Sequence, residues 1–587
     1  MQSTIKDQLA NLLSKTIKNL ALSRNITVSE QPVKVEYPPN TQMGHYATPI
    51  AMELAKVFKD NPRKIAESIL EQLGENKEIK ELFRDIKIEG PGFLNFFLSH
   101  QLHFKLLQEY EPEALEKLLY KEEAKEKVNF EFVSANPTGP LNIVSARSAA
   151  VGDCICRVLK KTGYRVTREY YVNDYGNQVR LLGLSFGYRH LQALGASVTL
   201  PDDCYQGGYI EELRSEIVKE TGLPEVLANT PTDVKECSIE NEQWAKYLQA
   251  LGDYFGPLAI EKIRSTHEAD LKSFGVEFDT FFSEKTLHEG GQVEEARTFL
   301  EEKGVLYEQE GASLFKSTKY GDDKDRVVVR SDGRPTYLLA DIAYHKSKID
   351  RGFEQIYDIW GPDHHGYIAR LSGAITAMGF GEKARETFGV IIVQQVNMIE
   401  DGVPVVMSKR LGKFHTMKDL LVQLPVDVVR YFFLMRSQTS HLDFDIDLAM
   451  TQSNKNPVYY IQYAYARINS IFREANVDIE KPVLFEMGQD SHEMLSPVRE
   501  KLLLHLWRYF EVVGDISRSF EVHILTDYLY ETASLFTGYY HDKENRILDK
   551  LKENPEEGKF LLRICQWTKM VLQDGLDLLG VSAPEKM

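Results

Sequence analysis

One stretch, from Val128 to Asp153, places the strongest constraint on how this chain can fold. It reads V-N-F-E-F-V-S-A-N-P-T-G-P-L-N-I-V-S-A-R-S-A-A-V-G-D. Apolar and polar residues alternate over 128–133, which predicts a strand, and the prolines and glycine at 137–140 predict a tight turn. Apolar residues then recur at helical spacing, up to a helix end expected near Gly163.

A second strand is predicted at 164–172, so the whole segment should form a strand–turn–helix–strand unit. In such a unit the helix begins at the carboxyl edge of a parallel sheet. Helix N-termini in that position bind phosphates and nucleotides, because their backbone N–H groups point outward and the helix dipole favours negative charge. The sequence therefore predicts a nucleotide site at this turn.

Length and composition indicate several globular domains. A chain of 587 residues is too long for one core, and 43% hydrophobic with 27% charged residues is typical of folded proteins. The start of the chain lacks the apolar core of a signal peptide, and no long uncharged apolar run could span a membrane. We therefore expect a cytoplasmic protein with no membrane partner. The net charge of −17 argues weakly against nucleic acid, although basic residues can gather on one face.

The five cysteines do not form a zinc pattern. Cys154 and Cys156 are too close for a zinc knuckle and fall on a predicted helix, and the others are scattered along the chain. We expect free thiols, no zinc and no other resident metal.

Three regions follow from the hydrophobic patterns. Residues 1–120 mix helices and strands and predict an α+β domain. Residues 121–450 contain the nucleotide-binding unit, with an insertion at about 190–320 that is too long for a crossover connection. Residues 451–587 have helical periodicity throughout and predict an all-α domain.

The second half of the nucleotide unit is expected to resume after the insertion. Short strands are predicted at 327–330, 336–339, 356–360 and 388–394. The strand at 356–360 ends in G-P-D-H-H, which includes Asp363 and His365. This run could be a metal site of Asp and His, but the sequence offers no third cluster of ligands.

Several runs resemble one protein family. F-V-S-A-N-P-T-G-P-L (132–141), A-R-S-A-A-V-G-D (146–153) and R-E-Y-Y-V-N-D-Y-G-N-Q (168–178) resemble the signature of class I arginyl-tRNA synthetases. G-H-Y-A-T-P-I-A-M-E-L-A (44–55) resembles the family's amino-terminal domain, which contacts tRNA, although an ordinary accessory domain would also fit. N-P-V-Y-Y-I-Q-Y-A-Y-A-R (456–467) resembles the family's anticodon-binding domain. The resemblance implies a Rossmann-type class I catalytic domain between these two.

One departure from the family pattern concerns its HIGH motif. The family usually has H-V-G-H or H-I-G-H between Leu141 and Ala146, whereas this chain has Asn142, Ile143, Val144 and Ser145. Both histidines, which the family places on the ATP phosphates, are missing. Asn142 and Ser145 keep the spacing of three residues, so both can face one side of the first helical turn and donate hydrogen bonds. They are equally suited to capping the helix.

A second motif, Met407-Ser408-Lys409-Arg410, resembles the KMSKS loop that clamps the triphosphate. Val406 stands at its first lysine position and Lys409 at the second.

The resemblance implies that the protein is an arginine–tRNA ligase, with arginine, tRNA(Arg) and ATP with Mg²⁺ as partners, and we expect a monomer. A guanidinium is always charged and needs carboxylate acceptors. The residues implied for each role are these: catalytic, Asn142, Ser145 and Lys409; ATP, Pro140, Asn142, Ser145, Asp363, His365, Met407, Ser408 and Lys409; arginine, Glu131, Ser134, Asn136, Tyr337 and Asp341; and the HIGH-like region, Asn136, Pro137, Thr138, Gly139, Pro140, Leu141, Asn142, Ile143, Val144, Ser145 and Ala146.

Two other functions are compatible with parts of the sequence. The missing histidines would suit a non-catalytic tRNA-binding paralogue, but such a protein need not keep Lys409 or the arginine-binding residues. A class I synthetase for another amino acid would also share the nucleotide unit. Tyr337 and Asp341, four residues apart on one helical face, favour a cationic side chain.

The first prediction concerns Lys409. Lys409→Ala should slow arginyl-adenylate formation with little change in tRNA affinity, because this lysine would meet the charge that develops on the leaving pyrophosphate. Rapid-quench measurement of adenylate formation tests it, and a wild-type rate would rule it out.

Overall fold

The computed structural model describes residues 4–28, 33–109, 126–383, 385–405, 416–488 and 491–587. It divides into two compact units. The sheet unit comprises residues 125–160 and 164–450, and the helical unit comprises residues 1–124, 161–163 and 451–587. Within the described parts of both units, none of the helices is long and apolar enough to cross a membrane.

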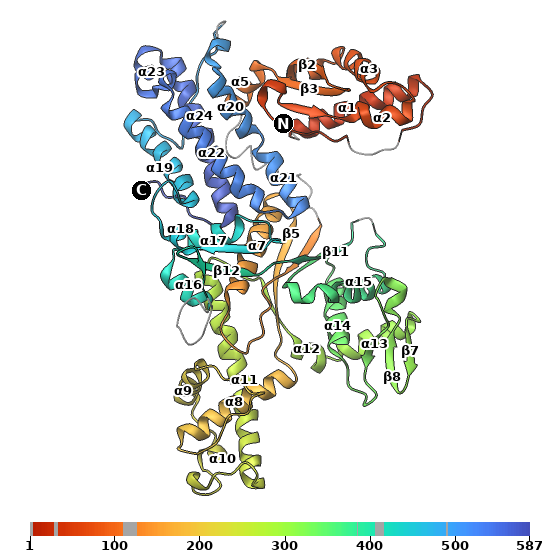
Figure 1. Ribbon diagram of the computed structural model, residues 1–587, viewed down its shortest axis with the longest axis vertical. Coiled ribbons are helices and arrows are strands. Elements are labelled where there is room, and N and C mark those ends of the chain that lie inside the picture. Colours follow the sequence, from red (N-terminus) through yellow and green to blue (C-terminus); the bar gives the residue numbers. More distant parts are fainter. Residues whose placement is uncertain (1–3, 29–32, 110–125, 384, 406–415, 489–490) are drawn as a thin grey trace. The chain divides into compact units, whose positions relative to one another are not determined.

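The predicted strand–turn–helix–strand unit is confirmed, as β4 (Lys127–Glu131), α7 (Ile143–Lys161) and β5 (Arg165–Val172). β4 and β5 are strands of a five-stranded parallel sheet with the order β11-β10-β4-β5-β6 (Figure 1). Its other strands are β6 (Thr280–Ser283), β10 (Gln355–Trp360) and β11 (Thr387–Ile392).

Helix α7 packs tightly against the centre of this sheet. A Cβ atom added to Gly152 would lie 2.4 Å from the ring of Phe132, just beyond β4. Real Cβ atoms do not approach so closely, so a glycine at this position allows the helix to lie against the strand. Val128, Phe130 and Phe132 are fully buried here.

The segment expected as one insertion is divided in two by β6, which pairs with β5 in the main sheet. Before β6 lies a helical lobe with its own core (Figure 1). Its helices are α8 (Asn177–Ala193), α9 (Tyr209–Thr221), α10 (Glu225–Ala228) and α11 (Glu242–Ser273). A Cβ added to Gly183 would lie 2.1 Å from the carbonyl oxygen of Gly252, so α8 and α11 nearly touch.

After β6 comes a second group of elements, which covers part of the main sheet. It comprises α12 (Glu284–Glu289), α13 (Gln292–Glu302), β7 (Leu306–Gln309), β8 (Ala312–Phe315), β9 (Arg326–Val329), α14 (Tyr337–Asp350) and α15 (Ile368–Ala377). The strand predicted at 336–339 is wrong, because these residues begin α14. Thr336 stands at the helix N-cap, and the apolar period that continues to 349 outweighs the β-propensity of its first residues.

The sheet unit ends in β12 (Val396–Glu400), β13 (Val403–Pro404), α16 (Met417–Gln423), α17 (Val426–Leu434), β14 (Leu442–Asp445) and α18 (Ile446–Met450). The motif at 407–410 lies outside the described residues. The chain is described again from Thr416, which caps α16.

The helical unit contains both ends of the chain. Its amino-terminal part is α+β, as expected: α1 (Ile5–Ser23), β1 (Tyr46–Thr48), α2 (Ile50–Phe58), α3 (Pro62–Gly74), α4 (Lys77–Leu82), β2 (Phe83–Glu89), β3 (Phe93–Leu98) and α5 (His100–Glu109). Its carboxyl-terminal part is helical: α19 (Pro457–Ala475), α20 (Pro497–Trp507), α21 (Tyr509–Ser519), α22 (His523–His541), α23 (Ile547–Glu553) and α24 (Pro555–Leu579). Glu511 joins the two parts, because its carboxylate accepts hydrogen bonds from Tyr37, Tyr46 and the backbone of Lys6.

Candidate active site

The order of the parallel strands predicts a ligand-binding crevice between β4 and β10. From the central strand β4 the chain proceeds to β5 and β6 on one side, whereas β10 and β11 lie on the other. Connections that leave adjacent parallel strands in opposite directions open a crevice at the carboxyl edge, where ligands bind. The runs after β4 and after β10, both predicted to bind ATP, therefore both lie at this edge.

The loop after β4, residues 134–140, is called the signature loop here. It begins with unusual backbone, because Val133 has φ of 69° and Ser134 has φ of 38°. Such values are costly for residues other than glycine, above all for a β-branched one, and persist only where neighbours enforce them. The enforcing contacts are a hydrogen bond from Val133 N to Ser148 Oγ (3.3 Å) and one from Tyr171 N to Ser134 Oγ (3.0 Å).

At the start of α7, Asn142 caps the helix. Its Oδ1 atom accepts hydrogen bonds from the backbone N (2.8 Å) and the hydroxyl (3.1 Å) of Ser145. Asn142 is exposed, and capping uses only its oxygen, so its amide group is still available as a donor. Asn142 also forms a β-bridge with Thr416, and Met417 N donates to Leu141 O (2.8 Å). Thr416 and Met417, the first residues described after the 407–410 motif, thus lie beside the HIGH-like turn. Met407, Ser408 and Lys409 are not among the described residues.

Three acidic residues lie side by side across the centre of the sheet. Asp358 on β10 is in register with Glu131 on β4, which is in register with Glu169 on β5. Asp358 and Glu169 are fully buried and Glu131 is nearly so. Adjacent buried carboxylates repel each other strongly, so the arrangement needs cations.

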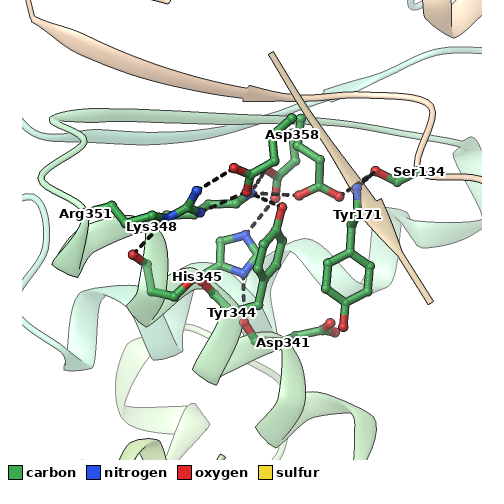
Figure 2. A network of polar contacts seen from close by, with 11 residues as sticks. Ser134, Tyr171, Asp341, Tyr344, His345, Lys348, Arg351 and Asp358 are labelled. Carbon is green, nitrogen blue, oxygen red and sulfur yellow. Dashed lines mark hydrogen bonds and ion pairs between the residues drawn. The ribbon is translucent and has the colours of Figure 1, made fainter. Parts of the chain in front are cut away.

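Helix α14 supplies these cations (Figure 2). Lys348 Nζ, itself fully buried, lies 2.7 Å from Glu131 Oε2 and 2.9 Å from Asp358 Oδ1. Arg351 binds Glu169 through two nitrogens, at 2.6 and 2.9 Å. The lysine charge and the His345 ring help to hold the pKa of Asp358 at about 2 despite its burial.

His345 is a further member of this network. Its Nδ1 lies 2.8 Å from the carbonyl oxygen of Asp341, and its Nε2 lies 2.8 Å from Asp358 Oδ2. Both partners are oxygen atoms, so both ring nitrogens are engaged within the network. The fixed cations that face the three carboxylates are Lys348 and Arg351.

Two further carboxylates beside the network have no such cation. Among the described residues, Asp341 and Glu284 form no ion pair with lysine or arginine. His288 Nε2 lies 3.5 Å from Glu284 Oε1, but burial lowers the pKa of His288 and so disfavours its charged form. Burial raises the pKa of Asp341 to about 6, and the charges of Glu131 and Asp358 add to this. Burial raises the pKa of Glu284 to about 7, and the charge of Asp341 contributes. The site therefore favours an incoming cation.

Two tyrosines adjoin this carboxylate pair. The Tyr367 hydroxyl donates to Asp341 Oδ2. The Tyr171 hydroxyl is buried and makes no hydrogen bond of normal length within the described chain. Burial and the charges of Glu284 and Asp341 raise the pKa of Tyr171. The Tyr171 hydroxyl interacts with Glu284, so each carboxylate of the pair has a tyrosine beside it.

The structure brings some of the predicted arginine-binding residues together and separates others. Glu131, Ser134 and Asp341 belong to one connected region, with Ser134 Oγ donating to Glu131 Oε1 (2.9 Å). Both oxygens of Glu131 are thus engaged by protein groups. Tyr337 is 62% exposed at the start of α14, and Asn136 is exposed on the signature loop.

Among the predicted ATP-binding residues, Pro140 is exposed on the signature loop. Asp363 and His365 are exposed on the short 3-10 helix Pro362–Tyr367 that follows β10.

Sequence reasoning missed Glu284 and Lys348. Glu284 directly follows β6, a strand hidden inside the expected insertion, so its position at the sheet edge could not be recognised. The sequence did contain a signal for the network, because each of three predicted strands includes one of its acidic residues, Glu131, Glu169 or Asp358. Charged residues in buried strands need partners.

Neither described cluster of potential metal ligands is suited to a metal ion. In the first, Glu131, His345 and Asp358, the ammonium of Lys348 already takes the place of a cation. In the second, His45, His103 and Glu500, each histidine Nδ1 accepts a hydrogen bond, from Leu98 N or Trp507 Nε1. The neutral rings therefore have their protons on the Nε2 atoms that face Glu500, which leaves no lone pair there for a metal.

Comparison with known families gives three matches along the chain. Residues 4–98 match the arginyl tRNA synthetase N terminal domain, and residues 113–422 match the catalytic domain of the class I tRNA synthetases (R). Residues 461–587 match the DALR anticodon binding domain.

Individual proteins give the same picture. The chain is 43% identical to an arginine–tRNA ligase of Leptospira interrogans, over 100% of this chain and 98% of that protein, and 40% identical to one of Bacillus subtilis, over 99% and 100%. Among solved structures, a putative arginyl-tRNA synthetase from Campylobacter jejuni is 32% identical with a TM-score of 0.69, over 84% of this chain and 100% of that one. The arginyl-tRNA synthetase of Thermus thermophilus is similar in fold, with a TM-score of 0.72 at 20% identity, over 99% and 100%.

The charge balance of the network predicts the effect of removing its central cation. Lys348→Met should lower the free energy of unfolding of the sheet unit by about 3–5 kcal/mol, because Glu131 and Asp358 would remain buried with one cation fewer. Lys346→Met, on the same helix but in a surface pair with Asp350, is the control and should change it by less than about 0.5 kcal/mol. Urea unfolding followed by a probe in the sheet unit measures both. Equal stability of the two variants would contradict the account.

Proposed function

The chain belongs to the class I arginyl-tRNA synthetases and is an arginine–tRNA ligase, and we propose that it activates arginine with ATP in the crevice between β4 and β10. The observation that supports this location best is the pair of uncompensated carboxylates, Asp341 and Glu284. The substrate guanidinium supplies the cation that this pair lacks. It is planar, always charged and able to form two parallel hydrogen bonds to each carboxylate.

The remaining polar groups of the substrate fit the start of the signature loop. Ser134 and Asn136 bind the ammonium group, at the carboxyl end of β4. Because both oxygens of Glu131 are engaged, Glu131 acts by orienting Ser134 and holding Lys348. Tyr337, on the exposed first turn of α14, packs over the guanidinium once arginine is bound.

ATP binds at the N-terminus of α7. The first N–H groups of a helix have no partner within the helix, and they favour phosphate. The Asn142 amide adds a donor on the same turn, close to Pro140, and the Ser145 hydroxyl becomes a second donor when it turns from Asn142 Oδ1 to the phosphate. Asp363 and His365 border the adenosine. Met407, Ser408 and Lys409 clamp the triphosphate, whose charge Mg²⁺ partly neutralises.

The reaction then proceeds in two steps. The arginine carboxylate attacks the α-phosphorus of ATP, and pyrophosphate leaves, which gives arginyl-adenylate. A ribose hydroxyl at the end of tRNA(Arg) then attacks the adenylate carbonyl, and AMP leaves. Fixed donors and Lys409 stabilise the charge that develops on the phosphate oxygens in the first step.

The tRNA anticodon binds the helical unit. A hollow of about 680 Å³ lies between α19 and α22, and half-buried tyrosines and an arginine line it. Unstacked bases bind between aromatic and guanidinium planes of this kind. Members of the lining set include Tyr459, Tyr460, Tyr463, Arg467 and Tyr540.

The carboxylate pair predicts a specific defect in Asp341→Asn. The variant should weaken arginine use by roughly 1.5–3 kcal/mol in kcat/KM, the value of one charge-assisted hydrogen bond, with the KM for ATP little changed. Steady-state aminoacylation with each substrate varied in turn measures this. Unchanged kcat and KM for arginine would show that the guanidinium binds elsewhere.

The altered HIGH motif predicts that Asn142 and Ser145 still contribute to catalysis. Loss of one fixed donor to a transition-state oxyanion typically costs about a hundredfold or more in kcat. The double variant Asn142→Ala/Ser145→Ala should therefore slow single-turnover adenylate formation by at least that order. A double variant as fast as the wild type would show that these residues only cap α7.

A further inference from the structure

Two side chains of the helical lobe bind the backbone of the signature loop. Tyr209, on α9, donates a hydrogen bond to the carbonyl oxygen of Thr138. His267, on α11, has its Nε2 atom 2.7 Å from the carbonyl oxygen of Gly139. A carbonyl only accepts, so Nε2 is the donor. The lobe thus holds two successive peptide groups of the loop.

The other nitrogen of His267 is also connected to the loop. Its Nδ1 lies 3.0 Å from the hydroxyl of Tyr170 on β5, and that hydroxyl lies 2.9 Å from the carbonyl oxygen of Ala135. A neutral ring with its proton on Nε2 has an acceptor at Nδ1, so the single hydroxyl proton of Tyr170 is donated either to Ala135 O or to His267 Nδ1. Tyr170 and His267 thus lie between the two ends of the loop, and each can donate to it. Both side chains are about 1% exposed, so neither meets solvent.

The signature loop depends on such external support for two reasons. It enters through positive φ values at Val133 and Ser134, which are unfavourable unless other contacts maintain them. It also contains Pro137 and Pro140, which have no N–H group and so cannot form backbone hydrogen bonds as donors. Hydrogen bonds that hold the loop are therefore accepted by its carbonyl oxygens.

We propose that His267 is a positioning residue for the ATP-binding loop, and that the helical lobe fixes the geometry of the phosphate site through His267 and Tyr209. This inference rests on the proposed ATP site. His267 is too buried to touch substrate, and it acts through Gly139 and Pro140 on the turn that begins α7. The helical lobe, which the sequence indicates only as an insertion, thus helps to position the ATP-binding loop.

The test compares conservative and non-conservative replacements of His267 in the full-length enzyme. His267→Gln keeps a donor for Gly139 O and an acceptor for Tyr170, whereas His267→Leu keeps only volume. His190→Leu is the matched control, because His190 is a buried histidine of the same lobe (4% exposed) on α8 and contacts Arg214 instead of the loop. The readouts are KM and kcat for ATP in aminoacylation, and hydrogen–deuterium exchange of peptides covering 132–142.

We expect His267→Leu to raise the KM for ATP by roughly five- to tenfold, the value of one or two neutral hydrogen bonds, and to speed exchange in the loop. His267→Gln should restore both to within about twofold of wild type, and His190→Leu should leave both unchanged within about twofold. If His267→Leu does not fold, Tyr209→Phe, which removes one hydroxyl, should raise the KM for ATP and speed exchange in the same peptides.

The proposal would be overturned if hydrogen–deuterium exchange of the peptides covering 132–142 were the same as in wild type in either variant, His267→Leu or Tyr209→Phe. An equal change in KM in the His190→Leu control would also overturn it, because the effect would then be general destabilisation of the lobe. Faster exchange of the loop with an unchanged KM for ATP would instead overturn the assignment of this loop to ATP.

Discussion

The ion pair that Lys348 forms with Glu131 and Asp358 is the interaction on which the site depends. Parallel strands in register place three carboxylates in a row across the sheet, an arrangement that is unstable without cations. Lys348 on α14 and Arg351 at its C-cap supply these cations, and the same helix presents Asp341 from its first turns. The spacing along one helix thus decides which carboxylates are neutralised and which are left for a substrate.

This arrangement also fixes the signature loop. Glu131 is held by Lys348 on one side and accepts from Ser134 on the other, so the cation in the core determines where the loop leaves β4. Buried ion pairs add little net stability compared with apolar packing, because desolvation offsets their attraction. The role of the ion pair between Lys348, Glu131 and Asp358 is better understood as conformational specificity, since it selects one geometry for the loop and the carboxylate pair.

Much of the fold followed from local patterns in the sequence. The βαβ unit and the helical carboxyl-terminal part were predicted because their periodicity extends over many residues. β6 was missed because its four residues, T-F-F-S, are too few to show a strand periodicity within a long helical region. The start of α14 was misassigned as a strand because Thr336 and Tyr337 have high β-propensity. The carboxylates of Glu131 and Asp341 were predicted to share a site, whereas Glu284 and Lys348 could be found only once the strands had been aligned.

The central claim is that Asp341 and Glu284 form a carboxylate pair that binds the guanidinium of arginine. Proton release on arginine binding tests this claim most directly. With pKa values of about 6 and 7 in the free enzyme, both groups are partly protonated near pH 6.5. A bound guanidinium favours the ionised forms and lowers both pKa values, so arginine binding should release protons near pH 6.5 and almost none above pH 8. Isothermal titration calorimetry in buffers with different ionisation enthalpies counts these protons. Net release that fades towards pH 8 is the predicted result, and the absence of release at every pH would contradict the account.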